Sequence, residues 1–355
     1  MRQEDYLKGR GAQYNPANPF SRQEYVQEHM ECLDEPLQMP PKREVFEENA
    51  RKIVNKVTSP DLSMMYSINP YQGCEHGCIY CYARNSHQYW GFSAGLDFES
   101  KLVAKKNAAD LLEKFLRNPR WKTQPVSLSG NTDCYQPLER ELRLTRGCLE
   151  VLRKYHHPVG IITKNALILR DLDILKDLAA EGLVHVYMSI TTLDEGIRQK
   201  MEPRTARASK RLEVMQRLTD AGIPCGVMAA PVIPGINNAE IPQIIEKAAA
   251  AGAVTAGYTI VRLNGSVGPI FKDWLFKNFP DRANKVWNQI CAMHGGNVND
   301  SEWGRRMHGE GHFAELTGNM FRQARSRFMS GREMPSYNLD VFTRPGKDKG
   351  QLSLF

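Results

Sequence analysis

From about residue 65 onward, short apolar stretches alternate with amphipathic helical stretches, and this alternation limits the possible folds more than any other feature. The apolar stretches predict strands near residues 65–71, 125–129, 158–163, 184–191, 224–231 and 256–263. Helical patterns lie between them, near residues 107–118, 139–157, 171–181, 208–221 and 239–251. Several strands are apolar on both faces, which is typical of parallel strands covered by helices. This order predicts right-handed crossovers and one parallel sheet.

About six strand–helix repeats are fewer than a closed eight-stranded barrel requires. We therefore expect an α/β fold, a partial (β/α)6 TIM-like barrel that is open on one side, with its chemistry at the carboxyl ends of the strands. The sequence divides into four predicted segments. These are an irregular N-terminal arm over residues 1–60 with one short helix near 45–56, a barrel core over 61–265, a helical region over 266–342 and a flexible tail over 343–355.

The eight cysteines and the net charge of +7 bear on the metal site, the compartment and the partners of this protein. Three cysteines fall within eight residues, at Cys74, Cys78 and Cys81, and the other five are scattered. This distribution indicates one metal site and single thiols in a reducing compartment. The charge permits an anionic partner such as nucleic acid without requiring one. The sequence contains no apolar run of roughly 20 residues, so we expect a cytoplasmic protein with no membrane partner.

The clustered cysteines have the spacing Cys-x3-Cys-x2-Cys within NPYQGCEHGCIYCYARN. A structural zinc site usually takes four ligands in two separated pairs, and ferredoxins supply a fourth cysteine soon after the third. Three thiolates can instead ligate three irons of a cubane cluster and leave the fourth iron open, as a catalytic metal site requires. A structural zinc loop is the alternative. His76 lies between the cysteines, and we interpret it as a loop residue rather than an iron ligand.

At this motif the chain resembles the radical S-adenosylmethionine (SAM) superfamily, in which the same spacing follows the first strand. Tyr80 occupies the aromatic position before the third cysteine, which packs near the SAM adenine in that family. The resemblance implies a [4Fe–4S] cluster on Cys74, Cys78 and Cys81, with SAM on the open iron. It also implies an external one-electron donor and reductive cleavage of SAM to a 5′-deoxyadenosyl radical, which abstracts a hydrogen from the substrate.

Within the superfamily the chain resembles the spore photoproduct lyase branch, through GCEHGCIYCYAR and the GRGA segment from Gly9 to Ala12, which is typical of an uncharacterised subgroup. Five further residues match positions that hold SAM in this branch. The resemblance implies that Thr132 and Asp133 face the SAM amino group, that Lys164 and Arg204 meet its carboxylate, and that Ser189 contacts the ribose or the carboxylate.

One position departs from that branch. Spore photoproduct lyase uses a cysteine near the end of the second strand to return a hydrogen atom to its thymine product, and this chain has Gly130 there. Cys134 lies four residues later in the same predicted loop. It is a candidate hydrogen donor or an ordinary loop cysteine. The sequence therefore does not assign a thymine dimer as the substrate.

The C-terminus carries a second kind of signal. Gln351, Leu352, Leu354 and Phe355 lie in QLSLF, an apolar end that follows a polar spacer. The pentapeptide resembles the clamp-binding motif of bacterial DNA polymerases and repair proteins, which implies the sliding clamp as a partner; a tail folded back on its own domain is the alternative. Basic residues near 198–217 and 305–332 fit either solvated helix faces or a phosphate track.

Together these features predict a radical SAM enzyme that acts on a nucleic-acid lesion or modification. Two alternatives remain open at this point. One is a radical SAM enzyme that modifies a protein or a small metabolite, which a barrel mouth without a basic rim would favour. The other is a non-enzymatic iron–sulfur protein that senses redox state, which would lack a SAM pocket.

Overall fold

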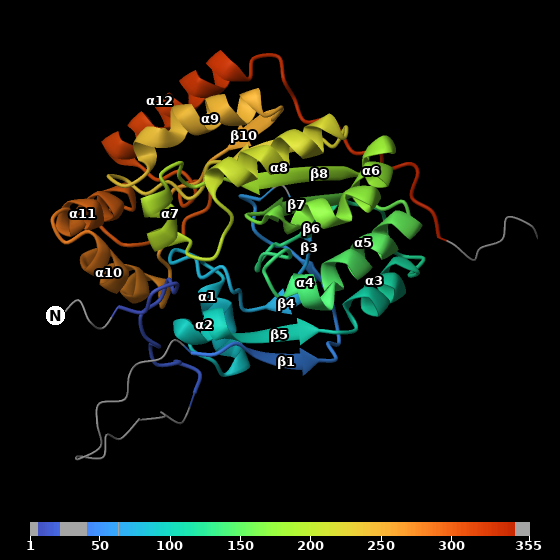
Figure 1. Cartoon of the computed structure of the whole chain (residues 1–355), viewed down its shortest axis with the longest axis horizontal. Coiled ribbons are helices and arrows are strands. Elements are labelled where there is room, and N and C mark those ends of the chain that lie inside the picture. Colours follow the sequence, from blue (N-terminus) through green and yellow to red (C-terminus); the bar gives the residue numbers. More distant parts are fainter. Residues whose placement is uncertain (1–5, 22–40, 63, 345–355) are drawn as a thin grey trace, which may run out of the picture.

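A seven-stranded sheet in the order β10-β9-β8-β7-β6-β3-β2 forms the centre of the protein (Figure 1). The computed structural model describes residues 6–21, 41–62 and 64–344. Within this sheet the strands from β10 to β3 pair in parallel, and β2 pairs with β3 antiparallel. This arrangement confirms the predicted partial barrel. The strand bounds are β2 Val54–Lys56, β3 Tyr66–Ile68, β6 Val126–Leu128, β7 Val159–Thr163, β8 Val184–Ser189, β9 Cys225–Met228 and β10 Thr255–Gly257.

Amphipathic helices cover the outer face of this sheet, and their apolar sides build the main core with the buried strand residues (Figure 1). Five helices follow the strands as the sequence predicts, and three form the C-terminal region. The first group is α3 Ala108–Leu116, α5 Leu144–Lys154, α6 Leu172–Ala180, α8 Ala208–Asp220 and α9 Ile241–Ala250. The second is α10 Val267–Asn278, α11 Ala283–Met293 and α12 Gly311–Phe328. None of the described helices is long and apolar enough to cross a membrane.

Short helices occupy the connections between the larger elements. They are α1 Arg84–His87, η2 Gln88–Trp90, α2 Leu96–Ser100, α4 Glu139–Leu142, η3 Ala166–Asp171, α7 Glu195–Met201 and η4 Asn238–Glu240. The helix predicted over 139–157 is split into α4 and α5, because Arg143 between them is left-handed with φ 54°. The Glu139 carboxylate accepts the backbone N–H groups of Thr145 (3.0 Å) and Arg146 (3.3 Å). A side chain of α4 therefore satisfies free donors in the first turn of α5.

The helix predicted near 45–56 is wrong, because this segment forms strands. Strand β1 (Glu44–Glu48) pairs in parallel with β5 (Lys101–Lys105), and β4 (Tyr71–Gln72) pairs antiparallel with β5 to complete a small second sheet. The register sets Glu44 beside Lys101 and Glu48 beside Lys105. Opposite charges on neighbouring strands favour this pairing, and a partner about 55 residues away cannot be read from local periodicity.

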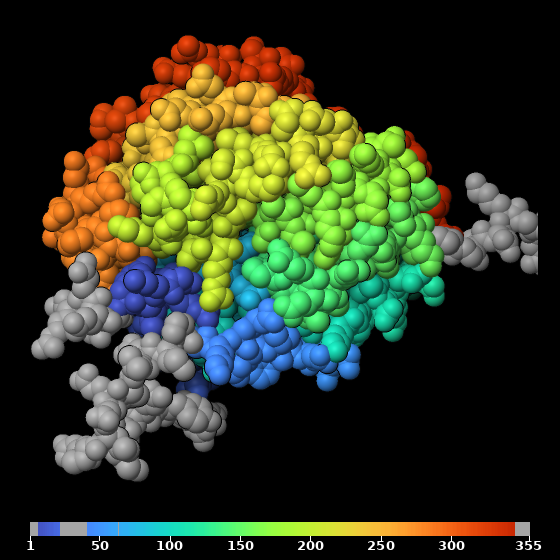
Figure 2. All heavy atoms as spheres, in the orientation of Figure 1, coloured from blue at the N-terminus to red at the C-terminus, as the bar shows by residue number. Residues whose placement is uncertain are grey.

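A second core lies outside the barrel, between the N-terminal residues and the C-terminal helices. Ala12 packs with Phe271 and Trp274 of α10, and Ile79 and Tyr80 belong to the same cluster. Figure 2 shows the N-terminal residues, in dark blue, against the orange C-terminal helices on the surface of the molecule. The described part of the N-terminal arm around Ala12 is thus packed close to the cysteine motif.

Residues 332–344, here called the C-terminal strap, run without helix across the amino ends of the strands. Asn338 N–H donates to Gly182 O at 3.0 Å, and Thr343 N–H donates to Tyr155 O at 3.1 Å. The Arg344 guanidinium donates to the carbonyls of Leu116 and Trp121 ahead of β6. The predicted helical region therefore ends at Phe328 rather than near 342, and the strap closes the end of the barrel opposite the strands' carboxyl ends.

The strap covers two buried histidines, and we expect it to make the fold sensitive to acid. Burial lowers the pKa of His157 and of His185 to about 4. His157 stacks edge-on against Phe342 (5.5 Å between ring centroids), and His185 stacks on Tyr337 (3.8 Å). Trp121 Nε1–H donates to His157 Nε2 at 3.2 Å, so that nitrogen carries no proton in the folded state.

Because the unfolded histidines take up protons near pH 6.5, their contribution to the free energy of unfolding should fall as the pH drops from about 6.5 and should stop changing below about 4. For fully buried His157 the loss should be about 3 kcal/mol, with a smaller share from His185. Urea unfolding across this pH range measures it. The H157N/H185N variant should weaken the dependence, leaving the share of His87, whose pKa burial also lowers to about 4, and removal of exposed His312 should leave it unchanged. A flat wild-type profile would contradict this account.

Candidate active site at the mouth of the barrel

The three clustered cysteines lie in a loop between β4 and α1, beside the carboxyl end of β3 as predicted. Cys74 and Cys78 are buried, and Cys81 is half-buried. Two backbone bonds anchor the loop: Cys74 N–H to Phe98 O at 2.8 Å and Ile79 N–H to Met201 O at 3.0 Å. All three thiols are free, and burial raises their pKa values.

A buried ion pair holds this loop in place. The Arg84 guanidinium is fully buried and donates to Cys78 O (Nε, 3.0 Å), Gly77 O (Nη2, 3.2 Å) and the Glu99 carboxylate (Nη2, 2.6 Å). Its Nη1 donates to the carbonyls of Ala94 and Gly95. A guanidinium with this many fixed acceptors sets the position of two residues inside the cysteine motif.

The N-terminal GRGA segment docks on the same ion pair. The Glu99 carboxylate accepts the backbone N–H of Ala12 at 2.7 Å and that of Gly11 at 3.1 Å. A Cβ atom on Gly11 would lie 1.8 Å from Gly77 O, so only glycine permits this approach. Gly77 itself has φ +65° and has no room for a side chain beside Glu99. The segment and the cysteine loop therefore form one unit.

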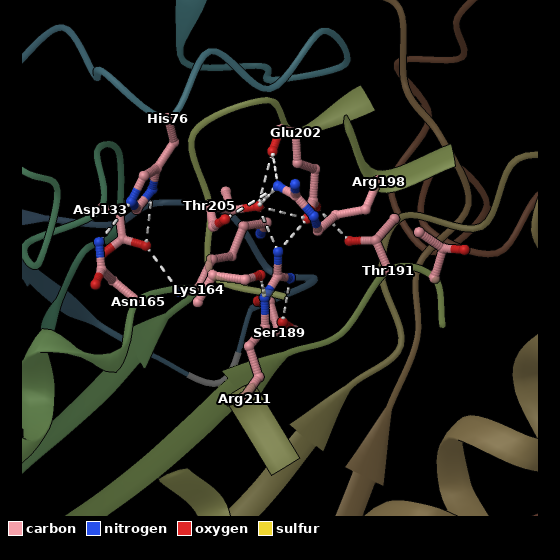
Figure 3. A network of polar contacts seen from close by, with 12 residues as sticks. His76, Asp133, Lys164, Asn165, Ser189, Thr191, Arg198, Glu202, Thr205 and Arg211 are labelled. Atoms are coloured by element: carbon pink, nitrogen blue, oxygen red, sulfur yellow. Dashed lines mark hydrogen bonds and ion pairs between the residues drawn. The ribbon is translucent and has the colours of Figure 1, made fainter. Parts of the chain in front are cut away.

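Across the mouth, His76 joins the cysteine loop to the ends of β6 and β7 (Figure 3). Its Nδ1 lies 3.3 Å from Asp133 Oδ2, and its Nε2 lies 3.1 Å from Asn165 Nδ2. Asn165 Oδ1 accepts the N–H of Leu167, so the amide nitrogen faces His76. This orientation makes Nε2 an acceptor and puts the ring proton on Nδ1, toward Asp133. His76 is thus the buried loop residue that the sequence predicts.

Asp133 is already well supplied with donors. Its carboxylate accepts Thr163 Oγ1 and Lys164 N–H, each at 2.8 Å, and Tyr135 N–H at 2.9 Å. Burial would raise its pKa, but His76 and these donors outweigh burial and lower the pKa to about 2. The carboxylate therefore stays ionised at the mouth and fixes the turn after β7.

Thr132 and Lys164 were also predicted to hold SAM. Thr132 precedes Asp133 in the sequence, and the Lys164 backbone bonds to the Asp133 carboxylate. Buried Thr132 donates its hydroxyl to Tyr71 O at 2.9 Å. Lys164 is half-buried, and its ammonium makes no hydrogen bond or ion pair with the described part of the chain. It interacts electrostatically with Cys78 and Cys81, where its charge opposes the upward pKa shift from burial. Figure 3 shows it between the Asp133 group and the Glu202 group.

The opposite wall of the mouth is built on Glu202, a fully buried carboxylate that the sequence analysis did not identify. It accepts the Tyr80 hydroxyl, Thr191 Oγ1 at 2.6 Å and Arg211 Nη2 at 2.5 Å. Burial alone would raise its pKa, but Arg211 and Lys164 outweigh it and lower the pKa to about 2. Tyr80, the aromatic residue of the motif, is therefore held at its hydroxyl end.

Ser189 and Arg204 lie on this wall. Ser189 is buried at the end of β8, and its carbonyl accepts Arg211 Nη1 at 2.7 Å. The Arg204 N–H donates to His76 O at 3.4 Å, which ties it to the cysteine loop. Its half-buried guanidinium makes no hydrogen bond or ion pair within the described ranges. The predicted set is therefore gathered around one mouth.

Cys134 lies apart from this set. Its side chain is fully buried in the main core, and burial raises the pKa of its thiol. At Gly130, a Cβ atom would lie 2.7 Å from Ser67 Cβ, so the position leaves no room for the cysteine of the lyase branch. The predicted clamp-binding residues Gln351, Leu352, Leu354 and Phe355 lie outside the described residues.

The donor set fits an iron–sulfur cluster. Reduced thiols are soft ligands, and a cluster's positive irons offset the cost of burying thiolates that the raised pKa values reflect. No group of three His, Cys, Asp or Glu side chains in the described residues could hold a single metal ion. In a cubane each thiolate binds a separate iron, so the three need not converge on one point.

Comparison with known proteins identifies the family. The profile of the radical SAM superfamily matches residues 68–248. An uncharacterized protein of Mycobacterium tuberculosis is 34% identical over 238 residues, covering 66% of this chain and 70% of the relative. An uncharacterized protein of Methanocaldococcus jannaschii is 28% identical over 250 residues, covering 70% of this chain and 89% of the relative.

Among solved structures, spore photoproduct lyase complexed with dinucleoside spore photoproduct superposes with a TM-score of 0.59 at 15% identity, covering 81% of this chain and 80% of the lyase. At this identity the likeness establishes the shared fold. The family match and the cysteine loop at the mouth agree on the chemistry of the site. The chain belongs to the radical SAM superfamily, whose enzymes use a [4Fe–4S] cluster and SAM.

Proposed function

We propose that this radical SAM enzyme cleaves SAM reductively and acts on a nucleic-acid lesion or modification in the cytoplasm. The observation that carries the SAM chemistry is the loop of three reduced thiols, two buried and one half-buried, beside Lys164, whose ammonium lacks a partner among the described residues. A bound cluster and SAM would supply a 5′-deoxyadenosyl radical for hydrogen abstraction, after reduction by an external one-electron donor.

The residues of this chain hold and orient the reactants. Cys74, Cys78 and Cys81 would each bind one iron. Lys164 and Arg204 are the half-buried cations suited to the SAM carboxylate, because neither forms an ion pair with a carboxylate in the described structure. The remaining contacts to SAM would come from Tyr80, Thr132, Asp133 and Ser189. Their hydrogen bonds within the protein fix the mouth before SAM arrives, which favours binding.

The Lys164→Met variant should bind SAM roughly ten- to a hundredfold more weakly, because it loses one charge-assisted contact to the carboxylate. Its cluster should assemble normally, since Lys164 ligates no iron. Equilibrium binding of SAM to anaerobically reconstituted protein measures the effect. Lys210→Met removes a surface lysine paired with Glu213 and should leave affinity unchanged. An unaltered SAM dissociation constant for Lys164→Met would assign this lysine a structural role.

The nucleic-acid assignment has separate support. The chain carries a net charge of +7, and a protein of the same fold binds a dinucleoside photoproduct. The missing thiol at Gly130 argues for a substrate other than that photoproduct. The test is a search for deuterium transfer from labelled DNA and RNA pools into 5′-deoxyadenosine. Transfer from a nucleic-acid pool supports the assignment, and transfer only from peptides or metabolites overturns it.

The proposed bacterial sliding clamp partner rests on the C-terminal sequence and on where the strap ends. The QLSLF end follows residue 344 within eleven residues. Arg344 bonds to carbonyls that precede β6, at the face opposite the cysteine loop.

Deletion of residues 351–355 should abolish clamp binding and leave SAM cleavage intact. Burial of Leu354 and Phe355 would supply about 1.5–3 kcal/mol each before ordering costs, so affinity should be modest. Titration of purified clamp with full-length and truncated proteins measures this. Equal binding by both proteins, or binding by neither, would show that residues 351–355 do not bind the clamp.

A further inference from the structure

Arg262 lies at the rim of the mouth, just beyond the last strand of the barrel. Val261 N–H bonds to Val232 O at 2.9 Å, which extends the pairing of β9 and β10 toward their carboxyl ends. Val261 and Leu263 are buried in the cluster that contains Tyr80, and half-buried Arg262 alternates with them. Its guanidinium interacts electrostatically with Tyr82, the residue after the third cysteine.

Arg262 forms no ion pair with a carboxylate in the described structure. Its Nη1 contacts Met307 Sδ at 3.5 Å, and its buried Nε–H has no acceptor among the described residues. The two nearby carboxylates form ion pairs with other arginines. Asp61 pairs with Arg306, and Asp300 pairs with Arg305. Burial and Arg306 together lower the Arg262 pKa despite these acids. An incoming anion at the Nη end of the guanidinium would offset its charge.

Two exposed aromatic residues lie on segments that bond to the chain around Arg262: Ile260 N–H donates to Met307 O at 3.0 Å, and Asn85 Nδ2 donates to Asn264 O at 2.8 Å. Tyr82 is 53% exposed, and its hydroxyl donates to Gly130 O across the mouth. Trp303 is 54% exposed, and the Arg306 guanidinium lies 3.7 Å from its ring centroid. Arg306 in turn neighbours Arg262. Aromatic faces beside a cation are the arrangement that proteins use for single-stranded nucleic acid, with bases on the rings and phosphate on the cation.

We propose that Arg262 binds a backbone phosphate of a single-stranded or flipped-out nucleic-acid segment, and that Tyr82 and Trp303 stack the bases on either side of it. This site rests on the proposed nucleic-acid function and deepens it, because it names the strand state and the rim that receives it. The segment would cross the mouth next to the cysteine loop, where hydrogen abstraction takes place.

Fluorescence anisotropy with a labelled single-stranded oligothymidylate of about 12 nucleotides tests the site, between about 50 and 200 mM salt. Arg262→Gln should lower affinity roughly tenfold and reduce the slope of log affinity against log salt by about 1. Arg262→Lys should keep the slope, because it keeps the charge. Trp303→Leu should lower affinity several-fold with an unchanged slope, because it removes stacking and no charge.

Two surface variants serve as matched controls. Arg117→Gln removes an arginine whose side chain is 64% exposed, and Tyr89→Leu removes an aromatic residue that is 76% exposed. Neither should change affinity or slope. Wild-type binding with an unchanged slope in Arg262→Gln would overturn this site and leave the proposed function standing. Absence of wild-type binding to this oligothymidylate and to a labelled oligouridylate of the same length would overturn the site and the nucleic-acid function together.

Discussion

A Cys78→Ala variant should contain almost no cluster iron and should lose the broad absorbance near roughly 400 nm that iron–sulfur sites give. Cys78 is one of only three closely spaced soft ligands in the sequence. Its carbonyl is fixed by Arg84 Nε at 3.0 Å, so the loop cannot readily bring another residue to that iron. Iron analysis and visible absorbance after anaerobic reconstitution measure the effect.

Cys291→Ala provides the control for this variant, because Cys291 is a half-buried thiol on α11, distant in sequence from the cysteine loop. It should retain wild-type iron and absorbance. Cys74→Ala and Cys81→Ala should behave like Cys78→Ala. Full iron content in any of the three loop variants would show that the assigned ligands are wrong.

A Gly11→Val variant should lose cluster retention although residue 11 ligates no iron. Any Cβ there would lie 1.8 Å from Gly77 O, so the N-terminal segment must leave the Glu99 carboxylate. Overpacking of this kind costs at least about 1–3 kcal/mol, and buried Glu99 also loses two backbone donors. We expect a lower melting temperature and roughly tenfold faster iron loss to a chelator.

Gly147→Ala is the matched glycine control. Its added Cβ would meet Ala109 Cβ at an ordinary 3.5 Å within α5. This change should be neutral or should stabilise the protein by about 0.5–1 kcal/mol, because alanine favours helix. Wild-type iron retention in Gly11→Val would mean that the GRGA segment does not position the cysteine loop.

Local patterns predicted the barrel well because its strands are buried on both faces and its helices carry one apolar side. The same patterns failed at residues 45–56, where pairing with β5 decides the structure. They also placed one helix across Arg143, where the Glu139 carboxylate favours a new start at Leu144. Contacts of this kind depend on the fold, and local sequence patterns do not predict them.

The candidate site divides in the same way. Cys74, Cys78 and Cys81 were predictable because ligand type and spacing are local properties of the chain. The Arg84–Glu99 and Arg211–Glu202 pairs were missed, since each joins residues that only the fold brings together. Arg84 directly follows the cysteine motif in YCYAR, and this position was the one available sign of its role.

SAM cleavage by the reduced, reconstituted wild-type protein tests the central claim most directly. Under anaerobic conditions with a strong one-electron reductant, we expect methionine and 5′-deoxyadenosine in equal amounts, and none from Cys78→Ala. Chromatographic quantification of both products measures it. A wild-type protein that holds a complete cluster, binds no SAM and forms neither product would contradict the account.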